Sequence, residues 1–155
     1  MKNTQPEKNL TPDEILAKLE YFCAYQERCP QEVRRKLTEL GAEGAIAEQI
    51  YSVLENDGFF NEARFAEAYA GGKFRVNQWG RVRIRLELRR RDISPGIIRQ
   101  ALENIGEETY LNTLQNLIAK KREQWPTAND YASKAKTAAA LIRAGYEPKL
   151  VFRYL

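Results

Sequence analysis

One apolar pattern recurs three times along the chain, and it constrains the fold more than any other feature of the sequence. Each occurrence has two core-facing residues four apart on a helix, followed after a turn by a second short apolar helix. Self-similarity at a period of about fifty residues is typical of a repeat architecture. The sequence therefore predicts an all-α fold of three tandem three-helix repeats. The pairs that define the pattern are Val33 with Leu37, Ile84 with Leu88, and Thr137 with Leu141.

Turn and capping residues indicate where the repeats begin and end. Thr11-Pro12-Asp13-Glu14 combines a hydroxyl N-cap, a proline at the first helical position and early acidic residues, which together favour a helix start. Asp57-Gly58 ends the first set of three helices. We predict a flexible N-terminal tail followed by three repeats, with the bounds 1–10, 11–57, 58–105 and 106–155.

The size of the repeats determines how they are expected to pack. A three-helix unit of about fifty residues buries too small a fraction of its chain to be secure alone, so its neighbours must complete its core. We therefore expect an elongated, curved array in a monomer. Leu155 stands in the third repeat where Leu54 and Leu102 stand in the first two. We expect its side chain to lie in the core of the third repeat.

Residues 81–88, RVRIRLEL, alternate polar and apolar side chains, which is the pattern of a half-buried strand. However, the sequence has no second strand-like run to pair with them, and the other repeats have a helix at the matching position. Leu, Arg and Glu are also good helix formers. We predict a helix, in which Val82 and Leu86 are partly exposed or cover a neighbouring helix.

The composition argues against an enzyme. The chain has no histidine, which is the commonest general base and the commonest nitrogen ligand for metals. It also has no phosphate-cradling glycine loop and no paired catalytic acids. If Cys23 and Cys29 share one helix, they lie about 9 Å apart, too far for a disulfide, so we expect reduced thiols in the core. We predict no catalytic residue, no cofactor and no metal.

The distribution of apolar residues argues against a membrane protein. The sequence has no run of the ~18 apolar residues that a membrane span needs. Residues 1–14 lack the apolar segment of a signal peptide. We expect a cytoplasmic protein that does not contact membranes.

Positive charge is concentrated in the second repeat. Residues 73–92 hold eight Lys or Arg against Glu87 and Asp92, a local net charge of +6, whereas the whole chain carries only +4. Such asymmetry indicates a partner with phosphates or carboxylates, and arginine binds both in a two-pronged manner. A solvated helix face is the alternative. The candidate contact residues are Lys73, Arg75, Arg81, Arg83, Arg85, Arg89, Arg90 and Arg91.

Two further features accompany this basic stretch. Lys120-Lys121-Arg122 in the third repeat either extend it or balance the negative end of a helix. Trp79 lies between the basic residues, where it either stacks on a nucleobase or fills the joint between two repeats. The aromatic residues Phe59, Phe60, Phe65 and Tyr69 are assigned to the core.

An ordered set of short motifs runs from the second repeat into the third. It comprises GFFNEARFAEAY at residues 58–69, Lys73-Phe74-Arg75, Trp79-Gly80, Ile84 with Glu87-Leu88, and LIRAGY at residues 141–146. In this order the motifs resemble the RecX family of bacterial recombination regulators, and the likeness extends over roughly residues 15–155. Two positions depart from the family pattern. Glu62 stands where aspartate is more usual, and Arg91-Asp92 stands where a Lys-Gly pair is common.

The resemblance implies a fold of three helix-turn-helix-like repeats that lies in the deep groove of the RecA filament on DNA. There a family member modulates, and usually inhibits, the strand exchange, ATP hydrolysis and co-protease activities of RecA. The implied partner is the RecA nucleoprotein filament, with single- or double-stranded DNA as a further candidate. The implied process is regulation of DNA repair, recombination and the SOS response.

An autonomous DNA-binding protein built of helix-turn-helix repeats is the alternative function. Such a protein needs side chains that read base edges at the start of a recognition helix. The second repeat offers mainly arginine there, and the third offers the alanine-rich DYASKAKTAAAL. This composition favours the regulator of a protein filament.

Overall fold

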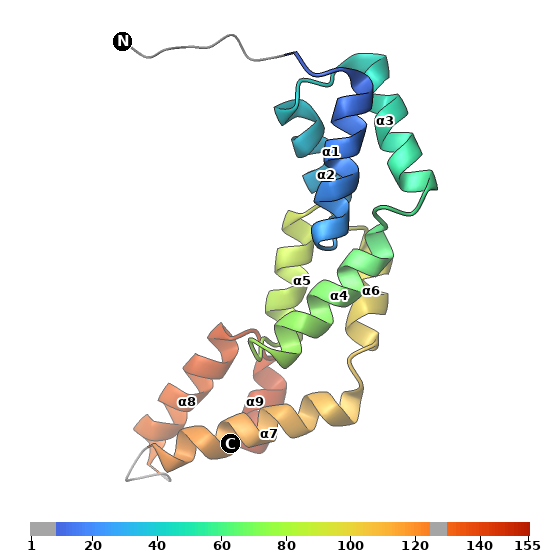
Figure 1. Ribbon diagram of the computed structural model, residues 1–155. Coiled ribbons are helices and arrows are strands. Elements are labelled where there is room, and N and C mark those ends of the chain that lie inside the picture. Colours follow the sequence, from blue (N-terminus) through green and yellow to red (C-terminus); the bar gives the residue numbers. More distant parts are fainter. Residues whose placement is uncertain (1–8, 125–129) are drawn as a thin grey trace, which may run out of the picture. The chain divides into compact units, whose positions relative to one another are not determined.

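The computed structural model describes residues 9–124 and 130–155, so most of the predicted tail, residues 1–10, lies outside the described residues. Within the described ranges the chain forms nine α-helices and no strand (Figure 1), and the all-α prediction is confirmed. The chain divides into two compact units, residues 1–65 and 66–155. The elongated array concerns how these units are arranged and stays a prediction.

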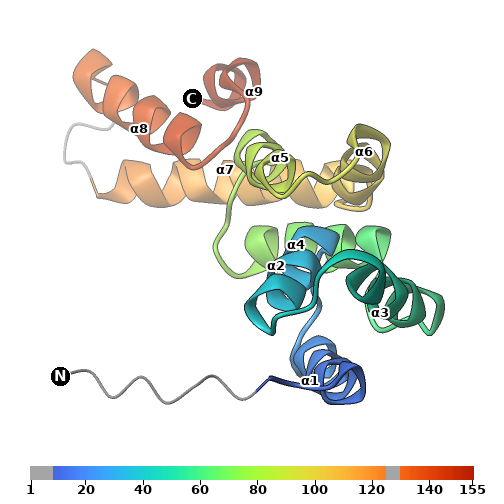
Figure 2. The ribbon, with the colours of Figure 1, turned by 90° about the horizontal axis from the view of Figure 1, so that it is seen from above.

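The first unit contains α1 (Pro12–Tyr25), α2 (Pro30–Glu39) and α3 (Gly44–Asn56), and each of these helices packs against the other two (Figures 1 and 2). Helix α1 begins as predicted, because the Thr11 side chain accepts a hydrogen bond from the Glu14 N–H at 3.2 Å. The repeating apolar positions form the core. The residues buried there include Ile15, Leu19, Val33, Leu37, Ile50, Leu54 and Phe60.

The two cysteines belong to the core of this unit, but not to one helix. Helix α1 ends at Tyr25, and Cys29 is the N-cap residue of α2, so the premise of a single helix was wrong. Both are buried and neither forms a disulfide within the described residues, as expected. Burial raises the pKa of Cys23, which keeps this thiol protonated and unreactive.

The second unit holds two further sets of three helices, although the first turn of α4 belongs to the first unit. Helices α5 and α6 pack together, and α7, α8 and α9 pack on one another. The tandem three-helix repeats are thus confirmed, while their predicted bounds stay a prediction. The helices are α4 (Glu62–Arg75), α5 (Arg81–Arg90), α6 (Pro95–Glu103), α7 (Glu107–Glu123), α8 (Tyr131–Arg143) and α9 (Pro148–Tyr154).

The stretch with alternating polarity is helical, as predicted. In α5 the core residues are Ile84 and Leu88, four apart. Val82 and Leu86, which the alternation places on the same side as them, are 43% and 47% exposed. The helical period, rather than the alternation, therefore decides which side chains this segment buries.

The middle helix of each repeat ends in the same way. Gly41, Asp92 and Gly145 adopt a positive φ of 86°, 56° and 105°. Each stands four residues after a buried leucine, and the N–H of the following residue donates to that leucine's carbonyl group, as in a Schellman motif. Asp92 thus takes a left-handed conformation that glycine takes in the other repeats. The three hydrogen bonds are Ala42 to Leu37 at 2.9 Å, Ile93 to Leu88 at 3.2 Å and Tyr146 to Leu141 at 3.1 Å.

The third repeat differs from the expectation at the C-terminal end of the sequence. Leu155 is half-buried, whereas Leu54 and Leu102 are buried. Val151 is fully buried instead and packs α9 against the other helices of its repeat. The short α9 ends at Tyr154, so Leu155 lies beyond the last helical residue and packs less closely.

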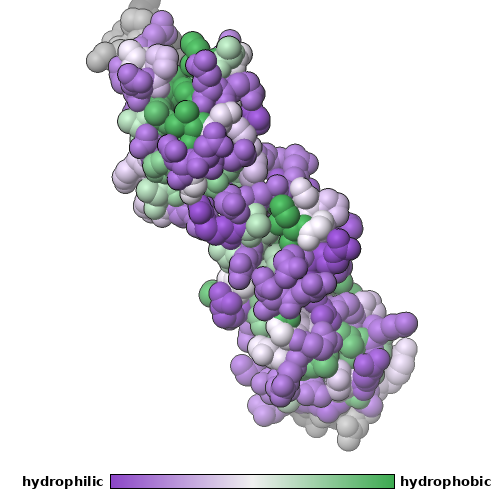
Figure 3. Space-filling view, turned by 90° about the vertical axis from the view of Figure 1, so that its right-hand side faces the viewer, coloured by the Kyte–Doolittle hydropathy of each residue, from purple (hydrophilic) through white to green (hydrophobic). Residues whose placement is uncertain are grey.

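The surface is consistent with a chain that buries its apolar residues within the repeats. On the face shown in Figure 3, hydrophilic side chains predominate and apolar ones form separate patches. None of the helices in residues 9–124 and 130–155 is long and apolar enough to cross a membrane.

Candidate functional site

Helix α5 carries most of the predicted contact residues and distributes them over two sides. Positions four apart lie on one side of a helix. Arg81, Arg85 and Arg89 form one such row, and Arg83, Glu87 and Arg91 form another. The two rows meet different neighbours, so the basic stretch is two surfaces with different chemistry.

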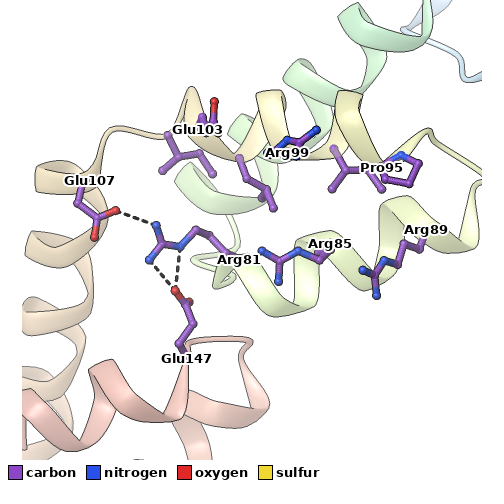
Figure 4. A pocket seen from close by; sticks show the side chains of 11 residues that line it. Arg81, Arg85, Arg89, Pro95, Arg99, Glu103, Glu107 and Glu147 are labelled. Atoms are coloured by element: carbon purple, nitrogen blue, oxygen red, sulfur yellow. Dashed lines mark hydrogen bonds and ion pairs between the residues drawn. The ribbon is translucent and has the colours of Figure 1, made fainter.

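Arg81 is bound within the protein. Its Nε and Nη2 atoms lie 2.9 and 2.5 Å from Glu147 Oε2, and Nη1 lies 2.8 Å from Glu107 Oε2 (Figure 4). The guanidinium carbon lies 3.8 Å from the centre of the Tyr110 ring, and the side chain is only 19% exposed. Although burial lowers the pKa of Arg81, the hydrogen bonds that it donates to both glutamates raise the pKa overall. Arg81 therefore joins α5 to α7 and to the start of α9.

Tyr110 and Tyr146 complete this internal cluster. The Tyr110 hydroxyl donates to Glu147 and accepts from the Arg81 N–H at 3.1 Å. The Tyr146 hydroxyl donates to the Gln78 carbonyl at 3.0 Å, and the two tyrosine rings lie 5.3 Å apart. Burial raises the pKa of both tyrosines, to about 12 for Tyr146. The motif residues around Gln78 and Tyr146 thus hold the second repeat on the third.

The second row of α5 faces aromatic rings of α4 and of the loop before α5. The Arg83 guanidinium lies 4.0 Å and the Lys73 ammonium 4.9 Å from the centre of the Trp79 ring. Arg91 lies 4.7 Å from the Tyr69 ring. Such distances allow cation–π attraction. A nucleobase stacking on an occupied face of Trp79 would have to displace a cation, so this arrangement favours a structural role for Trp79.

Tyr69 and Glu87 complete this aromatic side. Tyr69 is half-buried rather than fully in the core. Glu87 pairs with Arg90 at 2.8 Å and with Arg91 at 3.4 Å. Glu87 therefore partly neutralises Arg91 on this side.

The first row borders a pocket between α5 and α6 with a volume of about 600 Å³, which we call the α5–α6 pocket (Figure 4). Arg85 and Arg89 of α5 and Arg99 of α6 line it. Within the part of the chain that the structure describes, none of the three forms an ion pair. They are therefore the cations of this region that are best placed to bind an anion.

Arg99 is not among the contact residues predicted from the sequence, because it lies outside both the basic stretch of residues 73–92 and the cluster at residues 120–122. A signal was present, because Arg99 follows Ile98 and precedes Leu102 on a helix that the pattern places beside α5. An arginine next to core-facing positions on a packed helix lies at the border of that contact.

The remaining candidates lie elsewhere in the second unit. Arg75 borders a smaller pocket beside Gly71 and the turn between α6 and α7. Lys120 is exposed on α7, while Lys121 and Arg122 are half-buried. Arg122 Nη2 donates to the Tyr154 carbonyl at 3.4 Å. These residues do not form one continuous track with the row of Arg85 and Arg89.

The chain is similar in sequence to known proteins. The family model for the second three-helix domain of RecX matches residues 61–102, which include α4, α5 and all but the last residue of α6. The regulatory protein RecX of Bacillus cytotoxicus is 29% identical over 130 residues, which are 84% of this chain and 48% of that protein. The second three-helix repeat therefore matches a RecX domain, and the chain is similar to RecX proteins over most of its length. The RecX of Amycolatopsis mediterranei is 23% identical over 151 residues, 95% of this chain and 86% of that protein.

Solved RecX structures share the fold. The crystal structure of RecX from Lactobacillus salivarius superposes with a TM-score of 0.84 at 19% identity, and covers 92% of this chain and 93% of that one. A second crystal structure of a regulatory protein RecX superposes with a TM-score of 0.77 at 19% identity. The matched region covers 92% of this chain and 72% of that one. The chain spans about half the length of the Bacillus relatives that it matches.

Proposed function

We propose that this chain is a non-catalytic regulator that binds the groove of the RecA–DNA filament and inhibits the activities of RecA. Similarity to RecX proteins supports a regulatory role, since the curated relatives are named regulatory proteins. The observation that carries the proposal is the row of arginines along the α5–α6 pocket, where Arg85 and Arg89 have no carboxylate partner among the described residues.

The chemistry of these arginines fits a filament of protein on DNA. Such a filament presents carboxylates on its protein surface and phosphates on its DNA, and arginine forms paired hydrogen bonds with both groups. An arginine without an ion pair inside the protein can form these hydrogen bonds directly. An arginine that already binds a carboxylate must first break that ion pair. The proposed contact therefore centres on Arg85 and Arg89.

The structure narrows the set of residues that the proposal uses. Arg99 joins Arg85 and Arg89, because it borders the same pocket. Arg81 does not take part, since two glutamates already bind it. The cations beside Trp79 and Tyr69 are held by aromatic rings and add to the positive field rather than forming the first contacts.

A binding competition tests the proposal against autonomous DNA binding. The labelled chain is titrated with RecA-coated single-stranded DNA and with the same DNA alone, at physiological and at raised salt. Attraction to phosphate alone is indiscriminate and makes naked DNA at least as good a ligand. The proposal predicts a clear preference for the coated DNA, with affinity falling as salt rises. Equal or tighter binding to naked DNA would favour the DNA-binding alternative.

A further inference from the structure

We infer that the α5–α6 pocket binds an acidic peptide segment that carries an apolar side chain. This inference rests on the proposed function, because it gives the chemistry of the partner segment that the arginine row contacts. The volume of the α5–α6 pocket, about 600 Å³, is in the range of pockets that hold small ligands or anchoring side chains.

One end of the pocket is cationic. Arg85 and Arg89 lie one turn apart on α5, and Arg99 lies on α6 on the other side of the pocket (Figure 4). No ion pair neutralises these three side chains within residues 9–124 and 130–155. Three arginines that line one pocket attract carboxylates, and each guanidinium group can supply several donors to them.

The wall between these charges is apolar. Pro95, Ile98 and Leu102 of α6 line the pocket. Ile98 and Leu102 form its buried floor, and the exposed ring of Pro95 supplies most of the accessible apolar surface of α6 there. The aliphatic stems of the arginines add to this apolar lining. A ligand that brings only charge would leave this surface unused, whereas a leucine-sized side chain between two acids would cover it and gain hydrophobic free energy.

The other end of the pocket is anionic, and this favours a peptide over nucleic acid. Glu103, Glu107 and Glu147 border that end, and the last two hold Arg81 (Figure 4). A nucleic acid backbone carries a phosphate at every nucleotide, so a strand along the pocket would meet the carboxylates. A peptide can place acids against the arginines and an apolar or basic residue beyond them.

Two peptide probes and a pair of matched variants test the inference. The probes are a labelled Glu–Leu repeat peptide and a Glu–Gly repeat peptide of equal length and charge, and a single-stranded oligonucleotide of equal charge serves as a third ligand. The variants of the full chain are Arg89→Ala and Arg90→Ala. These neighbours in the last turn of α5 carry the same charge, but only Arg89 lines the pocket.

The expected result is that the Glu–Leu peptide binds more tightly than the Glu–Gly peptide and the oligonucleotide. Arg89→Ala should lower its affinity about ten-fold, the effect of losing one charge-assisted hydrogen bond. Arg90→Ala should lower it less than about two-fold, because an exposed charge outside the contact contributes little. Equal affinities for the two peptides, tighter binding of the oligonucleotide, or equal losses in the two variants would each overturn the inference.

The peptide test remains distinct from the test of the proposed function. If the Glu–Leu peptide binds as expected while the chain does not prefer RecA-coated DNA, the pocket chemistry stands and RecA is the wrong partner. If the coated DNA is preferred but the Glu–Leu peptide neither binds nor competes for it, the regulator stands and the inference about its pocket is wrong.

Discussion

Gly80 and Gly145 meet backbone to backbone, where the start of α5 crosses the turn between α8 and α9. A Cβ atom built on Gly80 would lie 2.3 Å from the carbonyl carbon of Gly145. The Gly80 N–H donates to the Ala144 carbonyl, and the Val82 N–H donates to the Gly145 carbonyl, both at 2.9 Å. The absence of a side chain at Gly80 therefore allows the second repeat to hydrogen-bond directly to the third.

Substitution Gly80→Ala should destabilise the fold. The new methyl group collides with backbone atoms that cannot rotate away, so we expect a loss of about 2 kcal/mol or more in the free energy of unfolding. Gly72→Ala in α4 is the control, because a Cβ there meets nothing within 4 Å. That change should stabilise by about 0.5 to 1 kcal/mol through the helix propensity of alanine. Denaturant titration measures both, and equal effects would contradict the close contact.

Substitution Arg81→Ala should cost far more stability than Arg85→Ala. The first removes charge-assisted bonds to Glu107 and Glu147 and leaves the half-buried Glu147 without its cation, for which we expect a loss of about 2 kcal/mol. The second removes an arginine without an ion pair among the described residues, and we expect less than about 0.5 kcal/mol. Similar melting temperatures for the two variants would show that the Arg81 cluster does not stabilise the fold.

Stability should fall at alkaline pH because of the buried tyrosines. In the unfolded chain a tyrosine loses its proton near pH 10, whereas burial raises the pKa of Tyr146 to about 12. The contribution of Tyr146 is therefore fully present below about pH 10, and between pH 10 and 12 it falls by about 1.4 kcal/mol per pH unit. Burial raises the pKa of Tyr110 as well, so its contribution begins to fall in the same window.

Denaturant titration across this window checks the assignment to Tyr146. The Tyr146→Phe variant lacks the ionisable hydroxyl, so its stability should decline less steeply with pH than that of the wild type. Titrating lysines contribute equally to both proteins. Parallel curves for the two proteins would show that Tyr146 ionises with the same pKa in the folded and unfolded states.

Asp92 should be replaceable by glycine with a gain in stability. Its φ of 56° is a left-handed conformation that costs an L-residue free energy, and Gly41 and Gly145 occupy the matching positions of the other repeats. We expect Asp92→Gly to raise the free energy of unfolding by about 0.5 to 1 kcal/mol, and Gly41→Ala to lower it by about 1 kcal/mol. Thermal denaturation of both variants measures the effect, and a destabilising Asp92→Gly would contradict this account of the helix end.

The fold could be predicted from the sequence because residues close together in the chain determine its helices and turns. Pairs such as Ile84 and Leu88 repeat at helical spacing, and turn residues separate the helices, so element type and repeat architecture follow from neighbours in the chain. The exposure of Leu155 could not be predicted in this way. Its position matches that of Leu54 and Leu102, but α9 ends one residue before it, and only the packing of Val151 shows which residue anchors the helix.

The candidate site was less predictable because it depends on distant partners. In the sequence Arg81, Arg85 and Arg89 are equivalent members of one row. The structure separates them. Arg81 donates hydrogen bonds to glutamates 26 and 66 residues further along the chain, whereas Arg85 and Arg89 line a pocket together with Arg99. Helical periodicity gives the row, but tertiary packing decides which cations are already neutralised.

The inhibition of RecA ATP hydrolysis by charge-reversed variants tests the proposed function most directly. Arg85→Glu with Arg89→Glu reverses the two arginines of the pocket, and Lys18→Glu with Arg35→Glu makes the same change in net charge at exposed positions of the first unit. Helical content by circular dichroism verifies that both variants fold. We predict that the concentration needed for half-inhibition is at least about ten-fold higher for the first variant than for the wild type. The second variant should inhibit like the wild type. Unchanged inhibition by the first variant, or equal losses in both, would contradict the account.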